Sequence, residues 1–98
     1  PAIHAGVAVK AERIDRMQAR LESRFAPCTV TIRDDSALHA GHAGARGGAG
    51  HYAVCIEAEA FRGQNRIERH RLVYATLEDM IPHEIHALSI DARAPDER

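Results

Sequence analysis

The sequence predicts a single α+β domain, in which helices pack mainly on one face of a three-stranded mixed sheet. Three observations lead to this fold class. The chain has 98 residues, the length of one small domain. Hydrophobic periods of helical and strand type follow one another in the order helix, strand, strand, helix, short helix, strand. A crossover through helical structure normally returns a strand parallel to the previous one, so we expect one antiparallel and one parallel strand pair.

The first predicted helix starts at Lys10 and ends before Pro27, and residues 1–9 are expected to form a flexible lead-in. Its apolar residues recur every three or four positions and comprise Ile14, Met17, Leu21 and Phe25. Charged residues of both signs fill much of the remaining surface. This mixture favours a helix that covers a sheet over one that binds a membrane.

Two predicted strands follow this helix and are joined by a long connection. Apolar residues alternate with polar ones over residues 28–33, and Tyr52, Val54 and Ile56 share one face of the segment 52–58. The connection, residues 37–50, carries five of the seven glycines, which raises the entropic cost of ordering its backbone. We therefore expect an antiparallel pair of strands with a mobile loop.

The second predicted helix begins at a capping-box pattern. Asn65 supplies the capping oxygen and Glu68 follows three positions later. Helical spacing of apolar residues then runs to Met80, and the short second part of this helical region ends before Pro82 because proline disfavours helical geometry at the preceding residue.

A last strand is predicted where apolar and polar residues alternate again around Leu88 and Ile90. His86 stands at the entrance of this strand. The predicted domain covers residues 10–92, and the charged residues 93–98 are expected to form a flexible tail.

Composition excludes several classes of function. With 45% hydrophobic residues and no long apolar run, the chain can fill one core but cannot span a bilayer. A net charge of -1 gives no general attraction to nucleic acid, so any such binding needs a local basic patch. Cys28 and Cys55 form no C-x-x-C unit and are expected to be reduced core residues. No catalytic motif or secretory signal is recognisable, so we expect a cytoplasmic protein without enzymatic activity.

Several separated motifs resemble the BolA family. They are Phe61-x-Gly63, then Arg69-His70-Arg71-Leu72-Val73-Tyr74, then Ile85-His86-Ala87-Leu88, preceded by Asp35-Ser36, His39 and His51-Tyr52. The resemblance extends from about Lys10 to Ala92. It implies a BolA-like fold, similar to the second class of KH-like folds.

Histidine is unusually frequent, with seven copies, and neutral imidazole is a common metal ligand. Spacing alone favours a partly buried structural role for His86. The resemblance instead implies that His86 ligates a [2Fe-2S] cluster shared with a monothiol glutaredoxin and glutathione. It implies a second ligand from the loop, for which His39 is the first choice and His42 the alternative.

Further expectations concern the other histidines and metals. His51 is expected to face solvent or to pin the start of the hairpin, and His4 and His83 to be exposed. A private zinc site is a weaker alternative, because zinc usually takes four ligands. The chain alone should hold a cluster poorly and be monomeric.

One concentrated basic region predicts an alternative function. It comprises the Gly63 turn with Arg66, Arg69, His70 and Arg71. Arginine's planar donors suit phosphate recognition, so a DNA-binding regulator is the second hypothesis. The resemblance supports it through the family's reported role in transcription. The GXXG loop of KH domains is not recognisable, and aromatic residues for base stacking are few.

Overall fold

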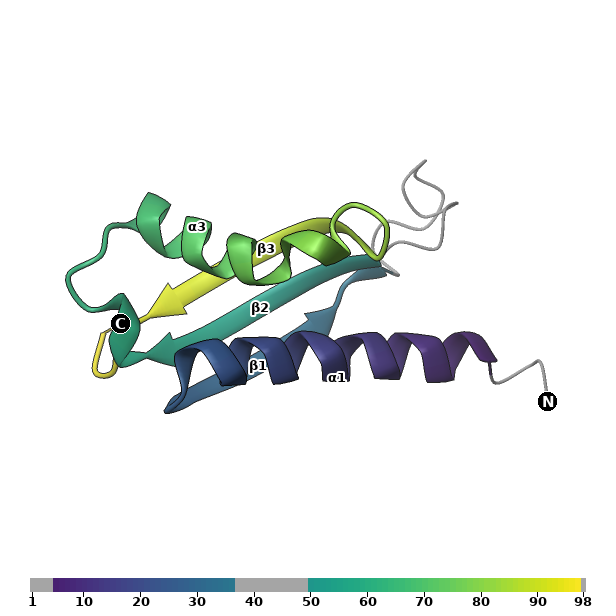
Figure 1. Ribbon diagram of the computed structural model, residues 1–98, viewed down its shortest axis with the longest axis horizontal. Helices are drawn as coiled ribbons and strands as arrows, with labels where there is room; N and C mark the ends of the chain where they lie inside the picture. The colour runs from purple at the N-terminus through teal and green to yellow at the C-terminus, as the bar shows by residue number, and fades with distance from the viewer. Residues whose placement is uncertain (1–4, 37–49, 98) are drawn as a thin grey trace.

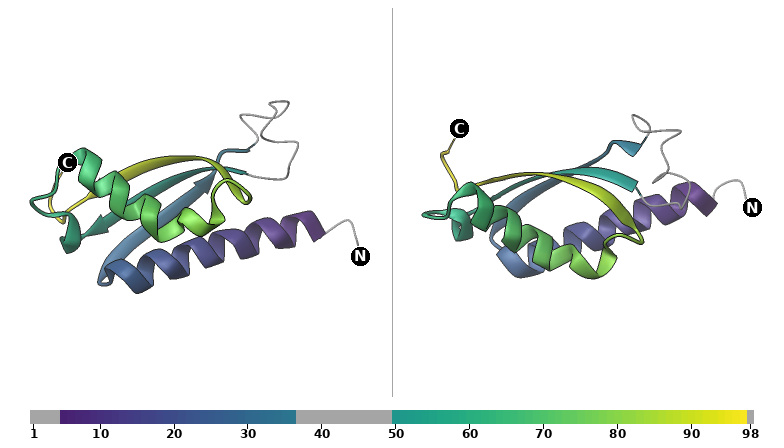
Figure 2. Two further views of the ribbon diagram at one scale, coloured as in Figure 1. Left: turned by 45° about the horizontal axis from the view of Figure 1, so that its top comes forward. Right: turned by 90° about the horizontal axis from the view of Figure 1, so that it is seen from above.

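The computed structural model describes residues 5–36 and 50–97. Its elements in chain order are α1 (Ala5–Phe25), β1 (Cys28–Asp34), β2 (Gly50–Ala58), the 3₁₀ turn η3 (Glu59–Phe61), α3 (Arg66–Leu77), the 3₁₀ turn η4 (Glu78–Met80) and β3 (Ile85–Arg93). The strand order is β1-β2-β3, with β2 antiparallel to β1 and parallel to β3. Both α-helices lie on the same face of the sheet (Figures 1 and 2). The predicted fold class is confirmed.

The core lies between this helical layer and the covered face of the sheet. Tyr52, Val54 and Ile56 alternate inward along the central strand and are buried, as predicted. They face the buried residues of the helical layer, which are Met17, Leu21, Phe25, Val73, Leu77 and Met80. Burying one such side chain contributes roughly 1.5–3 kcal/mol, so these contacts hold the helical layer on the sheet.

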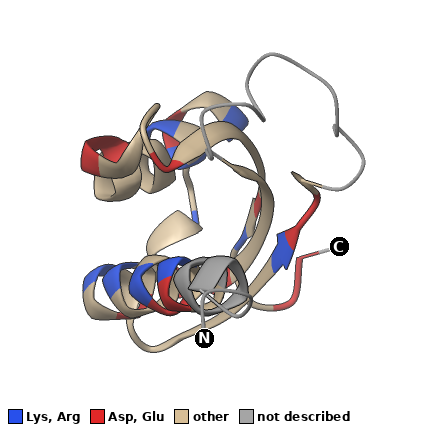
Figure 3. Ribbon diagram, turned by 90° about the vertical axis from the view of Figure 1, so that its right-hand side faces the viewer, with Lys and Arg blue, Asp and Glu red and all other residues tan. Residues whose placement is uncertain are grey.

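The helix α1 begins at Ala5, five residues before the predicted start. Alanine is the best helix former, and a helix that has nucleated gains one hydrogen bond for each residue added to its end. The predicted start of this helix is therefore wrong by five residues, the flexibility expected of residues 5–9 stays a prediction, and residues 1–4 lie outside the described part. Figure 3 shows basic positions repeated along α1, whose arginines are Arg13, Arg16, Arg20 and Arg24.

The helix α3 begins at the predicted cap. The Asn65 side chain accepts a hydrogen bond from the Glu68 backbone at 2.8 Å, and the Glu68 carboxylate accepts one from the Asn65 backbone at 2.8 Å. The predicted second short helix is the 3₁₀ turn η4, which continues directly from α3. The last strand starts at Ile85, so His86 is its second residue and not its first.

The expectation of buried cysteines is wrong for Cys55, which is exposed on the open face of the sheet. Cys28 is half-buried against the core, and both cysteines are free thiols as predicted. The tail that was expected to be flexible makes contacts with the domain, because Ala94 is buried and Glu97 is bound to Arg69. The loop 37–49 lies outside the described residues. Within the described ranges, no helix is both long enough and apolar enough to cross a membrane.

Candidate functional site

A bulge at the start of β3 places His86 at the surface. Gly50 of β2 pairs with Ile85, but the next residue, His51, pairs with Ala87, so β3 contains one extra residue at this point. That extra residue is His86, and its side chain is exposed. Bulges interrupt the regular alternation of a strand and turn one side chain in a new direction, often beside functional sites.

His51 lies next to His86. The two ring centroids are 5.1 Å apart and the ring planes are tilted by 49°. His51 is only 8% exposed, so of the two predicted roles, facing solvent is wrong. Its backbone N–H donates to Ser36 Oγ at 3.1 Å and its carbonyl accepts from the Asp35 N–H at 2.7 Å. It therefore pins the start of β2, as the other predicted role requires.

The turn before His86 is held by hydrogen bonds of the Glu84 backbone and by an ion pair of its side chain. Its carbonyl accepts from Gly50 N at 3.0 Å and from Arg13 Nη1 at 3.0 Å, and its N–H donates to the Met80 carbonyl at 2.8 Å. Its carboxylate pairs with Arg16, which lowers the pKa of Glu84. The turn that leads into the bulge is thus fixed to both α1 and β2.

Arg13, which holds the Glu84 carbonyl, is a buried residue. It is 7% exposed, and its Nη1 also donates to the Tyr52 hydroxyl at 3.2 Å. Sequence reasoning placed Arg13 on the outer surface of the helix, because an arginine between charged residues has the pattern of a solvated face. Its position one turn before Met17, on the apolar stripe, was the available signal.

The predicted loop ligands His39 and His42 lie outside the described residues. The described ends of that segment are Ser36 and Gly50, and both lie at the His86 end of the sheet, since Gly50 pairs with Ile85 and His51 bonds to Ser36. Among described residues, no group of three or more histidine, cysteine or acidic side chains could hold a metal ion. His83 is exposed, as predicted, and His4 lies outside the described part.

The predicted basic region is divided by its environment. Arg66 and Arg71 are exposed, and His70 is half-buried. Arg69, in contrast, is bound within the protein: its Nη atoms contact the Glu97 carboxylate and its Nε donates to the Gln64 carbonyl at 2.8 Å. Arg69 is thus paired with Glu97 in this structure, and its predicted role in binding stays a prediction. Sequence reasoning missed its partner because Glu97 lies 28 positions away.

A groove lies beside this region, between the start of α3 and the outer edge of β3. Its volume is about 470 Å³, and its lining residues are Gln64, Arg66, Arg69, His70, Ile90, Asp91 and Ala92. The Gly63 turn precedes the groove, and its φ of 79° explains the glycine, because other residues rarely adopt this backbone region. Asp91 is paired with Arg93, whose guanidinium lowers the Asp91 pKa.

Together, the fold and these two surfaces define a class: a small α+β domain in which two helices cover one face of a three-stranded sheet, with His86 and His51 at one end of the sheet and a groove lined by arginines between α3 and β3. The BolA-like protein family matches residues 21–97. The chain belongs to the BolA family.

Individual relatives agree with this assignment. The chain is 40% identical over 88 residues to Protein BOLA1, chloroplastic, of Arabidopsis thaliana, covering 87% of this chain and 55% of that protein. It is 29% identical over 76 residues to the DNA-binding transcriptional regulator BolA of Escherichia coli, covering 78% of this chain and 70% of that one. The BolA domain of SufE1 from Arabidopsis thaliana matches with a TM-score of 0.76 and 36% identity, covering 88% of this chain and 95% of that chain.

The chain spans only part of the length of the curated relatives it resembles. It covers 24% of SufE-like protein 1, chloroplastic/mitochondrial, of Arabidopsis thaliana, to which it is 40% identical over 87 residues and 84% of this chain. The names of the two Arabidopsis proteins place those proteins in organelles. The cytoplasmic location expected for this chain stays a prediction.

Proposed function

We propose that this chain is a non-catalytic adaptor that binds a monothiol glutaredoxin and shares a bridging [2Fe-2S] cluster with it, in iron–sulfur cluster trafficking or iron sensing. The observation that carries the proposal is the exposed His86 at the bulge, with a second imidazole 5.1 Å away. Histidine can replace cysteine on one iron of such a cluster. The donor set of this chain is incomplete, so a glutaredoxin cysteine and glutathione supply the remaining ligands.

The proposed ligands are His86 and one loop histidine, His39 first and His42 as the alternative. The segment that carries them starts and returns at the His86 end of the sheet. His51 is a third alternative, because its ring is already beside that of His86.

The test mixes the protein with a monothiol glutaredoxin, glutathione, iron and sulfide, and records visible absorption and circular dichroism. His86→Ala should abolish the spectrum of the cluster-bridged heterodimer, because an alanine leaves one iron without its nitrogen ligand. His39→Ala, His42→Ala and His51→Ala compared side by side identify the second ligand as the one whose loss changes the spectrum.

His83→Ala is the matched control, since His83 is an exposed histidine three residues before His86. It should leave the spectrum unchanged. A wild-type spectrum for His86→Ala would overturn the ligand assignment. Size-exclusion chromatography of the apo proteins measures separately whether the two chains associate without the cluster and whether this chain alone is a monomer.

A second candidate function is nucleic-acid binding at the groove between α3 and β3. The exposed Arg66 beside the half-buried His70 favours it, because both line the same groove. The Escherichia coli relative described above is named as a DNA-binding regulator. In this reading phosphates contact Arg66 in the groove and the exposed Arg71 on the same helix, while Ile90 and Ala92 supply the apolar part of the groove lining.

A further inference from the structure

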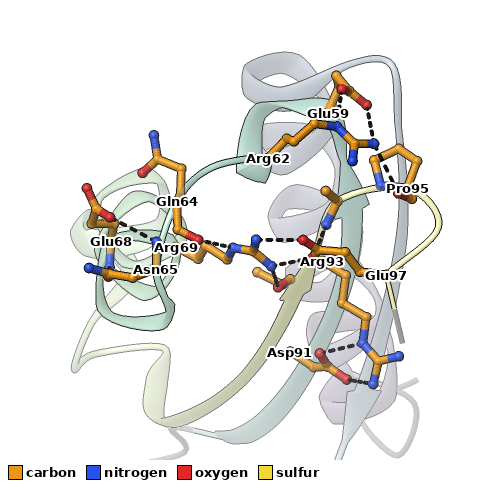
Figure 4. A network of polar contacts seen from close by, with 12 residues as sticks. Glu59, Arg62, Gln64, Asn65, Glu68, Arg69, Asp91, Arg93, Pro95 and Glu97 are labelled. Atoms are coloured by element: carbon orange, nitrogen blue, oxygen red, sulfur yellow. Dashed lines mark hydrogen bonds and ion pairs between the residues drawn. The ribbon is translucent and has the colours of Figure 1, made fainter.

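The carboxylate of Glu97 occupies a preformed anion site on Arg69. Its two oxygens accept hydrogen bonds from Nη1 at 2.6 Å and from Nη2 at 3.0 Å, and the backbone N–H of Ala94 donates to the same carboxylate at 2.9 Å (Figure 4). Paired donors of this kind are the strong geometry by which guanidinium groups recognise carboxylates and phosphates. Arg69 lowers the pKa of Glu97 to about 2, so the occupant is an anion at neutral pH.

Arg69 keeps its position through contacts that do not involve Glu97. Its Nε donates to the Gln64 carbonyl at 2.8 Å, and its Nη1 donates to the Ala92 carbonyl on β3 at 3.1 Å. These bonds fix the plane of the guanidinium against α3 and β3. Removal of Glu97 would therefore leave an oriented arginine and not a mobile one.

The occupied site borders the basic groove. Arg66 and His70 lie on the same wall as Arg69, and the acidic residue of the lining, Asp91, is already paired with Arg93. Ile90 and Ala92 are partly buried and supply apolar surface at the floor. An anion that displaces Glu97 would thus enter a groove with positive walls.

We propose that Glu97 is an intramolecular competitor that covers a phosphate site, and that a phosphodiester of single-stranded nucleic acid displaces it from Arg69. This inference rests on the second candidate function and adds its regulation. The observation that favours this ligand is the charge of the groove, because positively charged grooves follow the phosphate backbone in single-strand binders, and Arg66 and Arg69 line this one. The phosphate takes over the paired donors that the carboxylate leaves.

The size of the effect follows from exposure. The Arg69 side chain is 15% exposed and that of Glu97 is 36% exposed. Solvent screening therefore lowers the interaction energy of the ion pair, whereas its two parallel hydrogen bonds raise it. Neutralising Glu97 should tighten oligonucleotide binding by about 3- to 30-fold.

The experiment measures fluorescence anisotropy of a labelled single-stranded oligonucleotide of about 12 nucleotides, a length within known single-strand site sizes. The variants are Glu97→Gln, Arg69→Gln/Glu97→Gln and the matched control Glu59→Gln. Glu59 pairs with Arg62 at the surface and does not line the groove, and its neutralisation changes the net charge equally. Glu97→Gln should bind more tightly, the double variant should lose that gain, and Glu59→Gln should change little.

A second readout uses the wild-type chain. Displacement of the carboxylate removes the acceptor of the Ala94 N–H, so titration with the oligonucleotide should shift the Ala94 amide resonance towards its position in Glu97→Ala, which has no side-chain acceptor. Equal gains for Glu97→Gln and Glu59→Gln would indicate a general charge effect and overturn the proposal. Tighter binding of poly-glutamate than of the oligonucleotide would overturn the ligand class.

Variants of Arg66 and Arg71, the exposed arginines outside the Arg69–Glu97 pair, distinguish a failure of nucleic-acid binding from a failure of the competitor role of Glu97. If neither wild type nor Glu97→Gln binds the oligonucleotide at low salt, the nucleic-acid function itself fails, and the proposal fails with it. If binding is lost in Arg66→Gln/Arg71→Gln but is the same in wild type and Glu97→Gln, the function stands and the competitor role of Glu97 is overturned.

Discussion

Gly50 lies where the sheet has no room for a side chain. A Cβ atom at this position would lie 2.5 Å from the ring of Tyr52, which is buried and accepts a hydrogen bond from Arg13. The ring cannot move without breaking that bond, and Gly50 also donates to the Glu84 carbonyl that leads into His86. The packing of Tyr52 therefore requires glycine at position 50, and a shift of the Gly50 backbone would also disturb its hydrogen bond to the turn before His86.

Gly50→Ala should therefore lower the free energy of unfolding by about 1–3 kcal/mol, the usual cost of overpacking. Urea unfolding measures this loss, and the two-dimensional NMR spectrum should show shifts at Tyr52 and Glu84. Gly63→Ala is the contrasting control: it meets nothing within 4 Å but has a φ of 79°, so it should cost about 1–2 kcal/mol without disturbing those residues. A neutral Gly50→Ala would show that the ring relaxes freely.

At the scale of elements, the two α-helices position different surfaces. The contacts of Arg13 and Arg16 on α1 with Glu84 fix the turn before His86, whereas α3 supplies one wall of the basic groove. The start of α3 depends on the capping box of Asn65 and Glu68. Arg66 and Arg69 lie in its first turn and a half. Fraying of this end would therefore move their guanidinium groups away from the groove.

Asn65→Ala should lower the free energy of unfolding by about 1 kcal/mol through loss of the cap. Amide hydrogen exchange should accelerate first at residues 68–70, where the cap shields the end of the helix. Arg71→Ala, an exposed substitution on the same helix, should change stability by less than about 0.5 kcal/mol. A double-mutant cycle with Glu68→Ala tests the reciprocal bonds, and strict additivity would contradict their coupling.

At the scale of the whole molecule, periodicity in the sequence was enough to predict the sheet, its strand directions and the buried face of β2. It was not enough to predict the bulge at His86, because the register of a parallel pair depends on residues that are distant in sequence. The same reason hid the contact of His51 with His86 and the tie between Arg69 and Glu97. The expectation of two buried cysteines came from the absence of a disulfide or C-x-x-C pattern, whereas alternation places Cys55 opposite Tyr52, Val54 and Ile56, on the face that the helices leave open and where Cys55 is exposed.

The surface ion pairs connect the tail, the sheet and the helices, and they should make the stability of the whole protein sensitive to acid. Arginine hydrogen bonds lower the pKa of the carboxylates Glu59, Glu84, Asp91 and Glu97. A carboxylate with a lowered folded-state pKa stabilises the protein above its unfolded-state pKa, and this contribution is lost as the pH falls through the folded-state value. For Glu97 the window runs from its ordinary value of 4.5 down to about 2.

We therefore expect the urea midpoint to fall steadily as the pH is lowered from about 5 to about 2, which matches the range over which paired carboxylates become protonated. Most of these groups are exposed, so high salt should flatten the curve by screening the pairs. Glu97→Gln should remove the part of the decline that lies at the lowest pH, because Glu97 is the carboxylate whose pKa is lowered to about 2. If the curve of Glu97→Gln coincides with the wild-type curve, the ion pair between Glu97 and Arg69 does not stabilise the fold. In that case there would be no stable pair for a ligand to displace.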